Sequence, residues 1–183
     1  MISIPWMSFL VLVALAVGVA WWWLSRVDVS PPPVAMMPTR IAFPGGGLRL
    51  DSTEASISLL QKPDEIVIPF EHAILVIDWP LTNPARIAIT APIVQGFTRR
   101  ELVRAICEEY SNVYEAEDGT AHTKSVPLSL RSDGEKRNRT DGVYGIWGHD
   151  LADLRLTAVR WTRLPQGTVE IELHVEGEPR PAV

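Results

Sequence analysis

The sequence predicts an α+β domain behind a single N-terminal transmembrane helix and a proline-rich stalk. Three observations predict it: an uncharged apolar run at the start, one capped amphipathic helix at about residues 98–117, and several short runs rich in Ile and Val. A helix packed on a small antiparallel or mixed sheet would bury the apolar surfaces of both. We therefore divide the chain into an anchor (1–26), a Pro/Gly-rich linker (27–47), a globular domain (48–178) and a tail (179–183).

The first 25 residues predict a membrane span. Residues 4–25 carry no charged side chain, and a helix of that length, at about 1.5 Å per residue, covers about 33 Å against a hydrocarbon core of about 30 Å. Trp6 and Trp21–Trp23 lie near its two ends, where aromatic rings prefer the lipid–water boundary. A secretory signal peptide would need basic residues before the run and small residues in place of the three tryptophans. A buried core helix, the third reading, is rarely apolar on all sides in so small a domain. We predict a retained anchor that contacts lipid through residues 4–25.

The charges that flank the predicted span indicate on which side of the membrane the domain lies. Arg26 and Arg40 follow the span, so the positive-inside rule places the C-terminal domain on the cytoplasmic side. Asn138 begins an N-R-T glycosylation sequon, which would matter only if the domain faced a lumen.

The formal net charge is -5, whereas nucleic-acid binding needs a basic face, so no nucleic-acid partner is predicted. Cys107 is the single cysteine, and we expect a buried thiol inside a helix.

The linker contains two motifs. Pro31–Pro33 favour extended polyproline conformation and predict a stiff spacer, with a ligand for an SH3-type domain as the alternative. Gly45–Gly47 are not followed by the Gly-Lys-Ser/Thr of a phosphate-binding loop. These glycines therefore predict a turn that leads into the globular domain.

The first strands of the domain are short apolar runs bounded by prolines and acidic residues, at residues 65–70, 73–80 and 86–92. Pro69 inside the first run indicates an edge strand or a break between two strands. Together these runs predict the first half of a sheet.

The one clear helix follows. Thr98 and Glu101 form a T-x-x-E capping box, and Phe97 and Leu102 flank it as a hydrophobic staple. An apolar face recurs at helical spacing and comprises Leu102, Ile106, Tyr110, Val113 and Tyr114. Gly119 is the expected stop.

A polar stretch comes next, at residues 120–142. It contains Arg131, Lys136, Arg137 and Arg139, interrupted by Asp133, Glu135 and Asp141. The local net charge is too small for an anion site, so we expect a solvated loop.

The C-terminal part predicts a hairpin. Residues 153–162 and 168–176 flank a tight connection with Pro165 and Gly167. In the second strand, four apolar residues alternate with Glu170, Glu172, His174 and Glu176, which predicts one buried and one solvated face. The acidic outward row is also expected to discourage pairing at an exposed edge.

The stretch GVYGIWGHDLADLRL, at residues 142–156, permits two readings. In the first, Tyr144 and Trp147 fill the core, His149 hydrogen-bonds locally and Asp150 caps a short turn. In the second, Trp147 and His149 point outward and bind a ligand or partner. The candidate binding residues are Tyr144, Trp147, His149, Asp150 and Asp153. Burial of Trp147 distinguishes the readings.

Catalytic and metal motifs do not emerge from the sequence. The histidines lack ligand spacing to one another, and there is no G-x-S-x-G elbow. We therefore assign no catalytic residue, metal or cofactor. The remaining enzymatic reading is a hydrolase that uses His149 and Asp150.

Two elements carry a resemblance to a known family. The capped helix (TRREL through EEY, residues 98–110) and YGIWGHDLADL (residues 144–154) resemble a small uncharacterised domain of large DNA viruses of algae and protists and of some algal proteins. The resemblance covers about Phe97 to Trp161. Because that family has no known activity, it implies no catalytic residue. It implies that these two elements belong to one fold unit.

Taken together, these observations predict a membrane-anchored structural or interaction protein with a protein partner. A minor component of a membrane-bearing virion and an accessory subunit of a membrane complex both fit this description. The alternative is a membrane-anchored hydrolase that uses His149 and Asp150.

Overall fold

The computed structural model describes residues 39–43, 45–132 and 135–177. The predicted membrane span at residues 4–25, the proline motif and the tail lie outside these residues. Across the described part of the chain, none of the helices combines the length and apolar character needed to cross a bilayer. The described part is an α+β fold with one main helix, as predicted.

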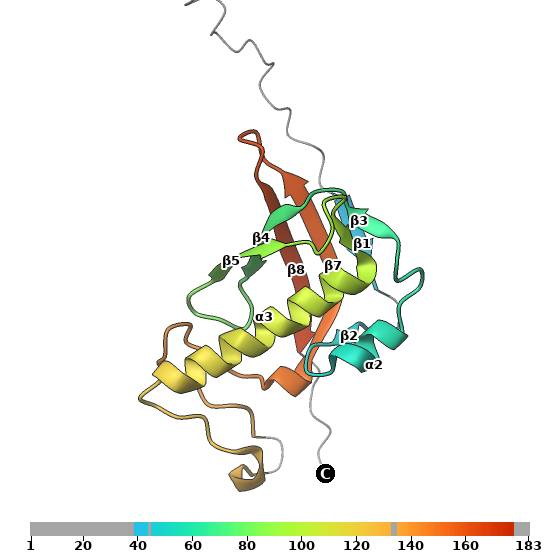
Figure 1. The fold of residues 1–183 in the computed structure, drawn as a ribbon. Coiled ribbons are helices and arrows are strands. Elements are labelled where there is room, and N and C mark those ends of the chain that lie inside the picture. The colour runs from blue at the N-terminus through green and yellow to red at the C-terminus, as the bar shows by residue number, and fades with distance from the viewer. Residues whose placement is uncertain (1–38, 44, 133–134, 178–183) are drawn as a thin grey trace, which may run out of the picture. The chain divides into compact units, whose positions relative to one another are not determined.

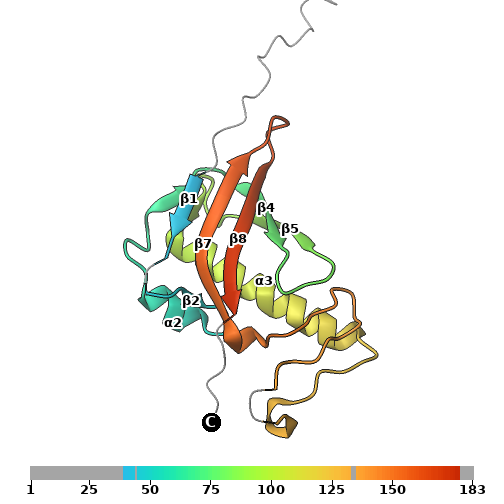
Figure 2. The same ribbon diagram turned by 180° about the vertical axis from the view of Figure 1, so that it is seen from behind.

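The main sheet is mixed, and its strands follow the order β1-β7-β8-β4-β5, with β2 also paired to β7. These strands are β1 (Thr39–Ala42), β2 (Leu48–Arg49), β4 (His72–Ile77), β5 (Ala85–Thr90), β7 (Leu154–Arg163) and β8 (Val169–Gly177). β4 runs parallel to β8, while the other pairs are antiparallel. Figures 1 and 2 show the sheet from its two sides.

A second, two-stranded sheet joins β3 (Ile66–Ile68) to β6 (Phe97–Thr98). The first predicted run therefore ends before Pro69, and β4 begins after it, which confirms the predicted break. The predicted hairpin is also confirmed. Leu164 N–H donates to the carbonyl of Thr168 at 2.8 Å, and Gly167 takes a φ of +91° in the connection.

The predicted helix is α3 (Arg99–Thr120), and Thr98 and Glu101 form its capping box. It continues past Gly119, because it ends with a hydrogen bond from Ala121 N–H to Glu117 O at 2.8 Å. A short helix that the sequence did not predict, α2 (Thr53–Ser58), lies beside α3 (Figure 1).

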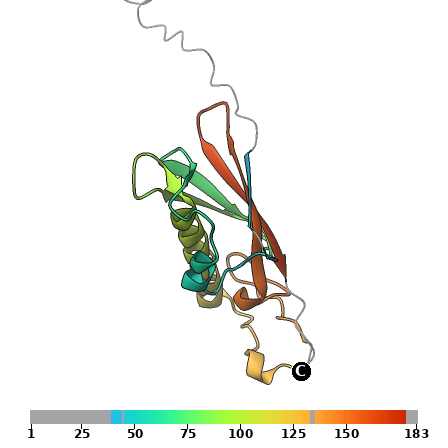
Figure 3. The same cartoon turned by 90° about the vertical axis from the view of Figure 1, so that its right-hand side faces the viewer.

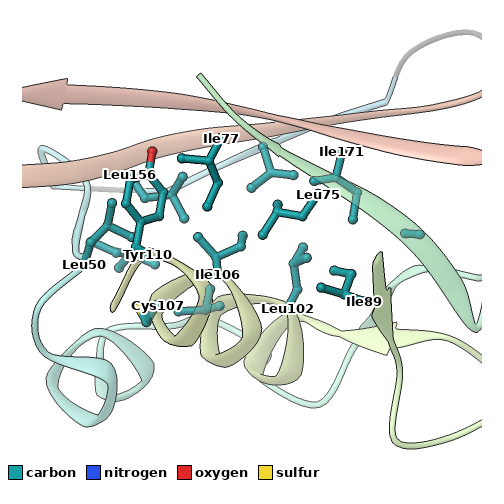
Figure 4. Close-up of a cluster of buried hydrophobic side chains, with 14 of the residues drawn as sticks. Leu50, Leu75, Ile77, Ile89, Leu102, Ile106, Cys107, Tyr110, Leu156 and Ile171 are labelled. Atoms are coloured by element: carbon teal, nitrogen blue, oxygen red, sulfur yellow. The ribbon is translucent and has the colours of Figure 1, made fainter. Parts of the chain in front are cut away.

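The core lies between α3 and one face of the sheet, as the side view in Figure 3 shows. Figure 4 shows Leu102, Ile106 and Tyr110 of α3 directed toward the strands, which contribute Leu75, Ile77, Leu156 and Ile171 to the same layer. Each fully buried Leu or Ile side chain contributes about 1.5–3 kcal/mol relative to exposure, so this contact is the main source of stability.

Cys107 lies in the same layer and is buried, as predicted. Burial raises the pKa of its thiol to about 11. The thiol therefore stays protonated near neutral pH and behaves as a small apolar side chain.

Two sequence predictions about the sheet are wrong. The linker was expected to extend to residue 47, but β1 pairs with β7, and Ile41 joins the core at 7% exposure. The acidic row of β8 does not guard an edge, because β8 lies between β7 and β4. Instead, Glu172 accepts a hydrogen bond from Arg160 at 2.7 Å, and Glu170 pairs with Arg86. The predicted exposure of His174 is confirmed.

Candidate docking site

The chain leaves the end of α3 and returns to the sheet through residues 121–150, which we call the connecting segment (Figure 1). Its described part contains one short helical turn, η1 (Leu128–Leu130). Hydrogen bonds hold three stretches of this segment side by side: one near Val126, one near Arg137 and Asn138, and one near Gly148. Val126 N–H donates to Asn138 Oδ1 at 2.8 Å, and Gly148 N–H donates to Arg137 O at 3.1 Å. Trp147 N–H reaches Pro80 O at 3.3 Å and ties the last stretch to the domain.

Glu117, in the last turn of α3, fixes the base of the segment. Its side chain is fully buried. The carboxylate accepts backbone N–H groups from Gly142 at 2.8 Å, Tyr144 at 2.8 Å and Gly145 at 3.0 Å. A buried carboxylate is costly unless hydrogen bonds satisfy it, and three backbone donors do so here.

Two opposing effects set the pKa of Glu117. Burial disfavours the charged form, but hydrogen bonds from the Thr140 hydroxyl and the backbone of Tyr144, Gly145 and Gly142 favour it more. The net result is a pKa below the usual range for glutamate. The group is therefore ionised near neutral pH.

Glycine is required where the segment meets this carboxylate. A Cβ on Gly142 would lie 2.6 Å from Glu117 Oε2 and 2.7 Å from the Glu117 backbone oxygen. Gly145 adopts a φ of +65°, which other residues rarely take. The glycine spacing of GVYG thus serves the contact with α3.

Two buried arginines hold the middle of the segment. Arg131 forms a two-point contact with Asp150, with Nη1–Oδ2 at 2.6 Å and Nη2–Oδ1 at 3.0 Å. Arg137 donates to Asp150 Oδ1 at 3.4 Å and to Asp118 Oδ1 at 2.9 Å. The two arginine side chains are 3% and 6% exposed. The Asp150 carboxylate thus joins two distant parts of the segment to the start of η2 (Leu151–Asp153).

Arg131 also reaches forward to the tip of the segment. Its Nε donates to Val126 O at 2.7 Å. Because the same guanidinium binds Asp150, this side chain links the chain before the η1 turn to the start of η2.

Aromatic residues of the domain pack beneath the network. The Tyr114 hydroxyl donates to His149 O at 3.0 Å, and the Arg137 guanidinium lies 5.2 Å from the centre of the Tyr114 ring. Burial raises the pKa of Tyr114, so the hydroxyl remains a donor. The His149 ring packs on Trp79 with centroids 4.7 Å apart, and a Cβ on Gly177 would overlap it.

The segment leaves large apolar side chains in solvent. Nine such residues are exposed across the described ranges, and five belong to this segment. We call these five the loop surface: Val126, Leu128, Leu130, Val143 and Trp147. Trp147 is 42% exposed and Leu130 is 74% exposed. A segment that is held by buried hydrogen bonds and displays apolar groups is typical of an interaction site.

The five predicted site residues have different environments. Tyr144 is half-buried and packs on the core, as the first reading required. Trp147 is exposed, as the second reading required. His149 is half-buried against Trp79, so it does not point outward.

Of the two predicted aspartates, Asp153 binds a backbone N–H group and Asp150 binds two arginine side chains. Asp150 is the N-cap residue of the short turn η2, as expected, and the carboxylate of Asp153 accepts Asp150 N–H at 3.0 Å. The Asp150 carboxylate is bound by Arg131 and Arg137. The prediction of a solvated loop is therefore wrong for these two arginines, whose side chains are buried and pair with Asp150 and with the exposed Asp118. It is confirmed for Lys136 and Arg139, which are exposed.

Sequence reasoning missed Glu117, Arg131, Arg137 and Trp79. Glu117 sits in an acidic run and looks like a surface residue. One signal was present: Glu117 follows Val113 and Tyr114 at spacings of four and three, which continues the buried face of the helix.

Within the described ranges, no group of three or more His, Cys, Asp and Glu side chains is placed to hold a metal ion. Comparison with known proteins found no matching family model, no matching curated protein and no matching solved structure.

Proposed function

We propose that this chain is a membrane-anchored docking protein. In this proposal residues 4–25 insert into the bilayer, and the loop surface binds a protein partner. The observation that carries it is the exposure of Trp147 on a segment whose base and middle are held by buried charged groups. A minor membrane component of a virion and an accessory subunit of a membrane complex are the settings we propose for it.

Preorganisation supports this function. Binding costs less when the contact groups are already fixed, because little conformational freedom is lost on association. Glu117 fixes the base of the connecting segment and Arg131 fixes its middle in the free domain. A tryptophan offers large contact area with few rotatable bonds, and such residues dominate the energy of many interfaces.

The charges around the loop surface suggest the chemistry of the partner. The exposed basic residues of the described segment are Lys124, Lys136 and Arg139, and the exposed acidic ones are Glu135 and Asp141. We expect a protein with an apolar recess and a modest excess of acidic groups at its rim. Adsorption of the domain to anionic lipid is less favourable, because the chain carries a formal net charge of -5.

The hydrolase alternative is weaker on the geometry of its two residues. A general base or metal ligand needs a carboxylate available to the reacting atoms. The Asp150 carboxylate instead accepts hydrogen bonds from Arg131 and Arg137. The ring of His149 is covered on one side by Trp79.

Substitution of Trp147 tests the proposal. The intact chain, solubilised from its native membrane, should co-purify with one stoichiometric partner. Trp147→Ala should weaken that association by about tenfold or more, since loss of a central aromatic contact costs about 2 kcal/mol. Leu59→Ala is the matched control, because Leu59 is 62% exposed but lies outside the connecting segment. Equal loss of partner in both variants would contradict the proposal, as would no loss in Trp147→Ala.

A further inference from the structure

Strand β5 forms one edge of the main sheet, as Figure 2 shows. It pairs with β4 over its full length, from Ala85 to Thr90. Within residues 39–43, 45–132 and 135–177, no strand pairs with its other side. Among the described strands, none therefore pairs with the outward backbone groups of β5, an arrangement that natural proteins usually block.

The alternation of hydrogen-bonded pairs between β4 and β5 shows which backbone groups of β5 face this open edge. Ala91 N–H donates to Glu71 O at 2.8 Å, and these residues are opposite each other in the β4–β5 register. Hydrogen-bonded and non-hydrogen-bonded pairs alternate along an antiparallel ladder. The N–H and C=O groups of Ala85, Ile87 and Ile89 therefore face β4. Those of the intervening residues point away from it: Arg86, Ala88 and Thr90.

We infer that β5 pairs with β5 of a second copy of this chain, antiparallel, about a two-fold axis at Ala88. In that register Ala88 faces Ala88 of the other copy, and Arg86 faces Thr90. The outward N–H and C=O groups of all three residues then find partners across the axis. Two-fold dimers are the commonest symmetric assemblies, because one self-complementary surface suffices.

Two prolines select this register over its neighbours. Pro84 precedes the strand and Pro92 follows it. A shift of the axis by one residue toward either end would place Pro84 opposite Thr90, or Pro92 opposite Arg86. Because proline has no N–H, either shift leaves a carbonyl of a strand residue without its donor, whereas in the Ala88 register the two prolines lie opposite each other beyond the ends of β5.

The side chains fit the same register on both faces of the sheet. On the helix-covered face Ile87, which is only half-buried, would meet Ile89 of the other copy and lose solvent contact. On the open face the small Ala88 lies at the axis and avoids a clash. Arg86 meets Thr90 rather than a like charge, and its own charge is paired with Glu170. This inference uses a part of the fold outside the connecting segment and does not rest on the proposed function.

A cysteine at the axis tests the register directly. In a hydrogen-bonded antiparallel pair the Cα atoms lie about 5.5 Å apart, which suits a disulfide. The intact chain in detergent, carrying Ala88→Cys, should form a disulfide-linked dimer on mild oxidation. Arg40→Cys is the matched control, since Arg40 is exposed on β1 at the opposite edge of the sheet. This control should form no disulfide-linked dimer, and the native Cys107 is buried.

Proline at the same position provides the second measurement. Ala88→Pro removes an outward N–H but no bond to β4, so the domain should still fold. The unmodified chain should sediment at twice its 20.3 kDa monomer mass and Ala88→Pro at the monomer mass. If Ala88→Pro does not fold, the comparison of Ala88→Cys with Arg40→Cys tests the inference on its own. The inference is overturned if the unmodified chain is monomeric, or if Ala88→Cys cross-links no more than Arg40→Cys.

Discussion

Replacing Glu117 with alanine should lower the free energy of unfolding by about 3–5 kcal/mol. The carboxylate is fully buried and accepts three backbone N–H groups from residues 142–145. Alanine would leave these donors without an acceptor at the junction of the connecting segment with α3. Such a loss is a large fraction of the 5–15 kcal/mol that typically separates folded from unfolded domains.

Urea denaturation of the two proteins measures this effect. Glu115→Ala is the control, because Glu115 lies on the same helix and is exposed. An exposed substitution of this kind should change stability by no more than about 0.5 kcal/mol. Similar midpoints for the two variants would show that Glu117 does not hold the segment.

The contribution of Glu117 should also depend on pH, with a definite sign. Its folded-state pKa lies below its usual value, so the unfolded chain takes up a proton first as the pH falls. The stabilisation is complete above the unfolded pKa of about 4.3 and is lost as the pH falls through the folded pKa. The stability difference between the unmodified chain and Glu117→Ala should therefore shrink below about pH 4 and stay constant above about pH 6.

Asp150→Ala is expected to have the second-largest effect, a loss of about 3 kcal/mol. Its carboxylate compensates two arginines whose side chains are 3% and 6% exposed. Removal of one partner from a buried ion pair is costly because the remaining charge stays in the interior. The Asp150 carboxylate is itself 20% exposed, which keeps the expected loss at the lower end of the range for buried pairs.

The control for Asp150 is another aspartate–arginine pair on the surface. Asp64 is 80% exposed and lies 3.2 Å from Arg100 Nε, so Asp64→Ala should cost at most about 0.5 kcal/mol. Thermal unfolding of both variants gives the comparison. If Asp150→Ala is as stable as Asp64→Ala, Asp150 does not organise the segment. The hydrolase alternative would then regain support.

Local patterns were sufficient to predict most of the fold. The capping residues and apolar spacing of α3, the break at Pro69 and the β7–β8 hairpin all depend on neighbours close in sequence. The pairing of β1 with β7 depends on residues more than a hundred positions apart, so the linker boundary was placed too late. The same limitation concealed the central place of β8, because alternation alone does not identify the neighbours of a strand.

The candidate site was less predictable, for a related reason. Arg131 and Arg137 lie in a polar stretch and became interior residues because Asp150 and Asp118, distant in sequence, compensate them. Exposure of Trp147 could not be derived from its type, since tryptophan is more often packed in a core. The glycine and aromatic pattern did identify the stretch that contains Trp147. Burial of Trp147 was the observation that distinguishes the two readings of this stretch.

One measurement tests most directly whether the chain is anchored in a bilayer and docks a protein. A photoreactive amino acid replaces Val143 of the loop surface, which leaves Trp147 in place; native membranes that contain the intact chain are irradiated and then washed with alkaline carbonate. We predict that the chain remains in the membrane pellet and carries one protein adduct of defined mass, which is absent when the probe replaces the exposed Leu59. Release of the chain into the wash would contradict the anchor. Adducts to lipid alone, or the same adduct from both positions, would contradict docking through the loop surface.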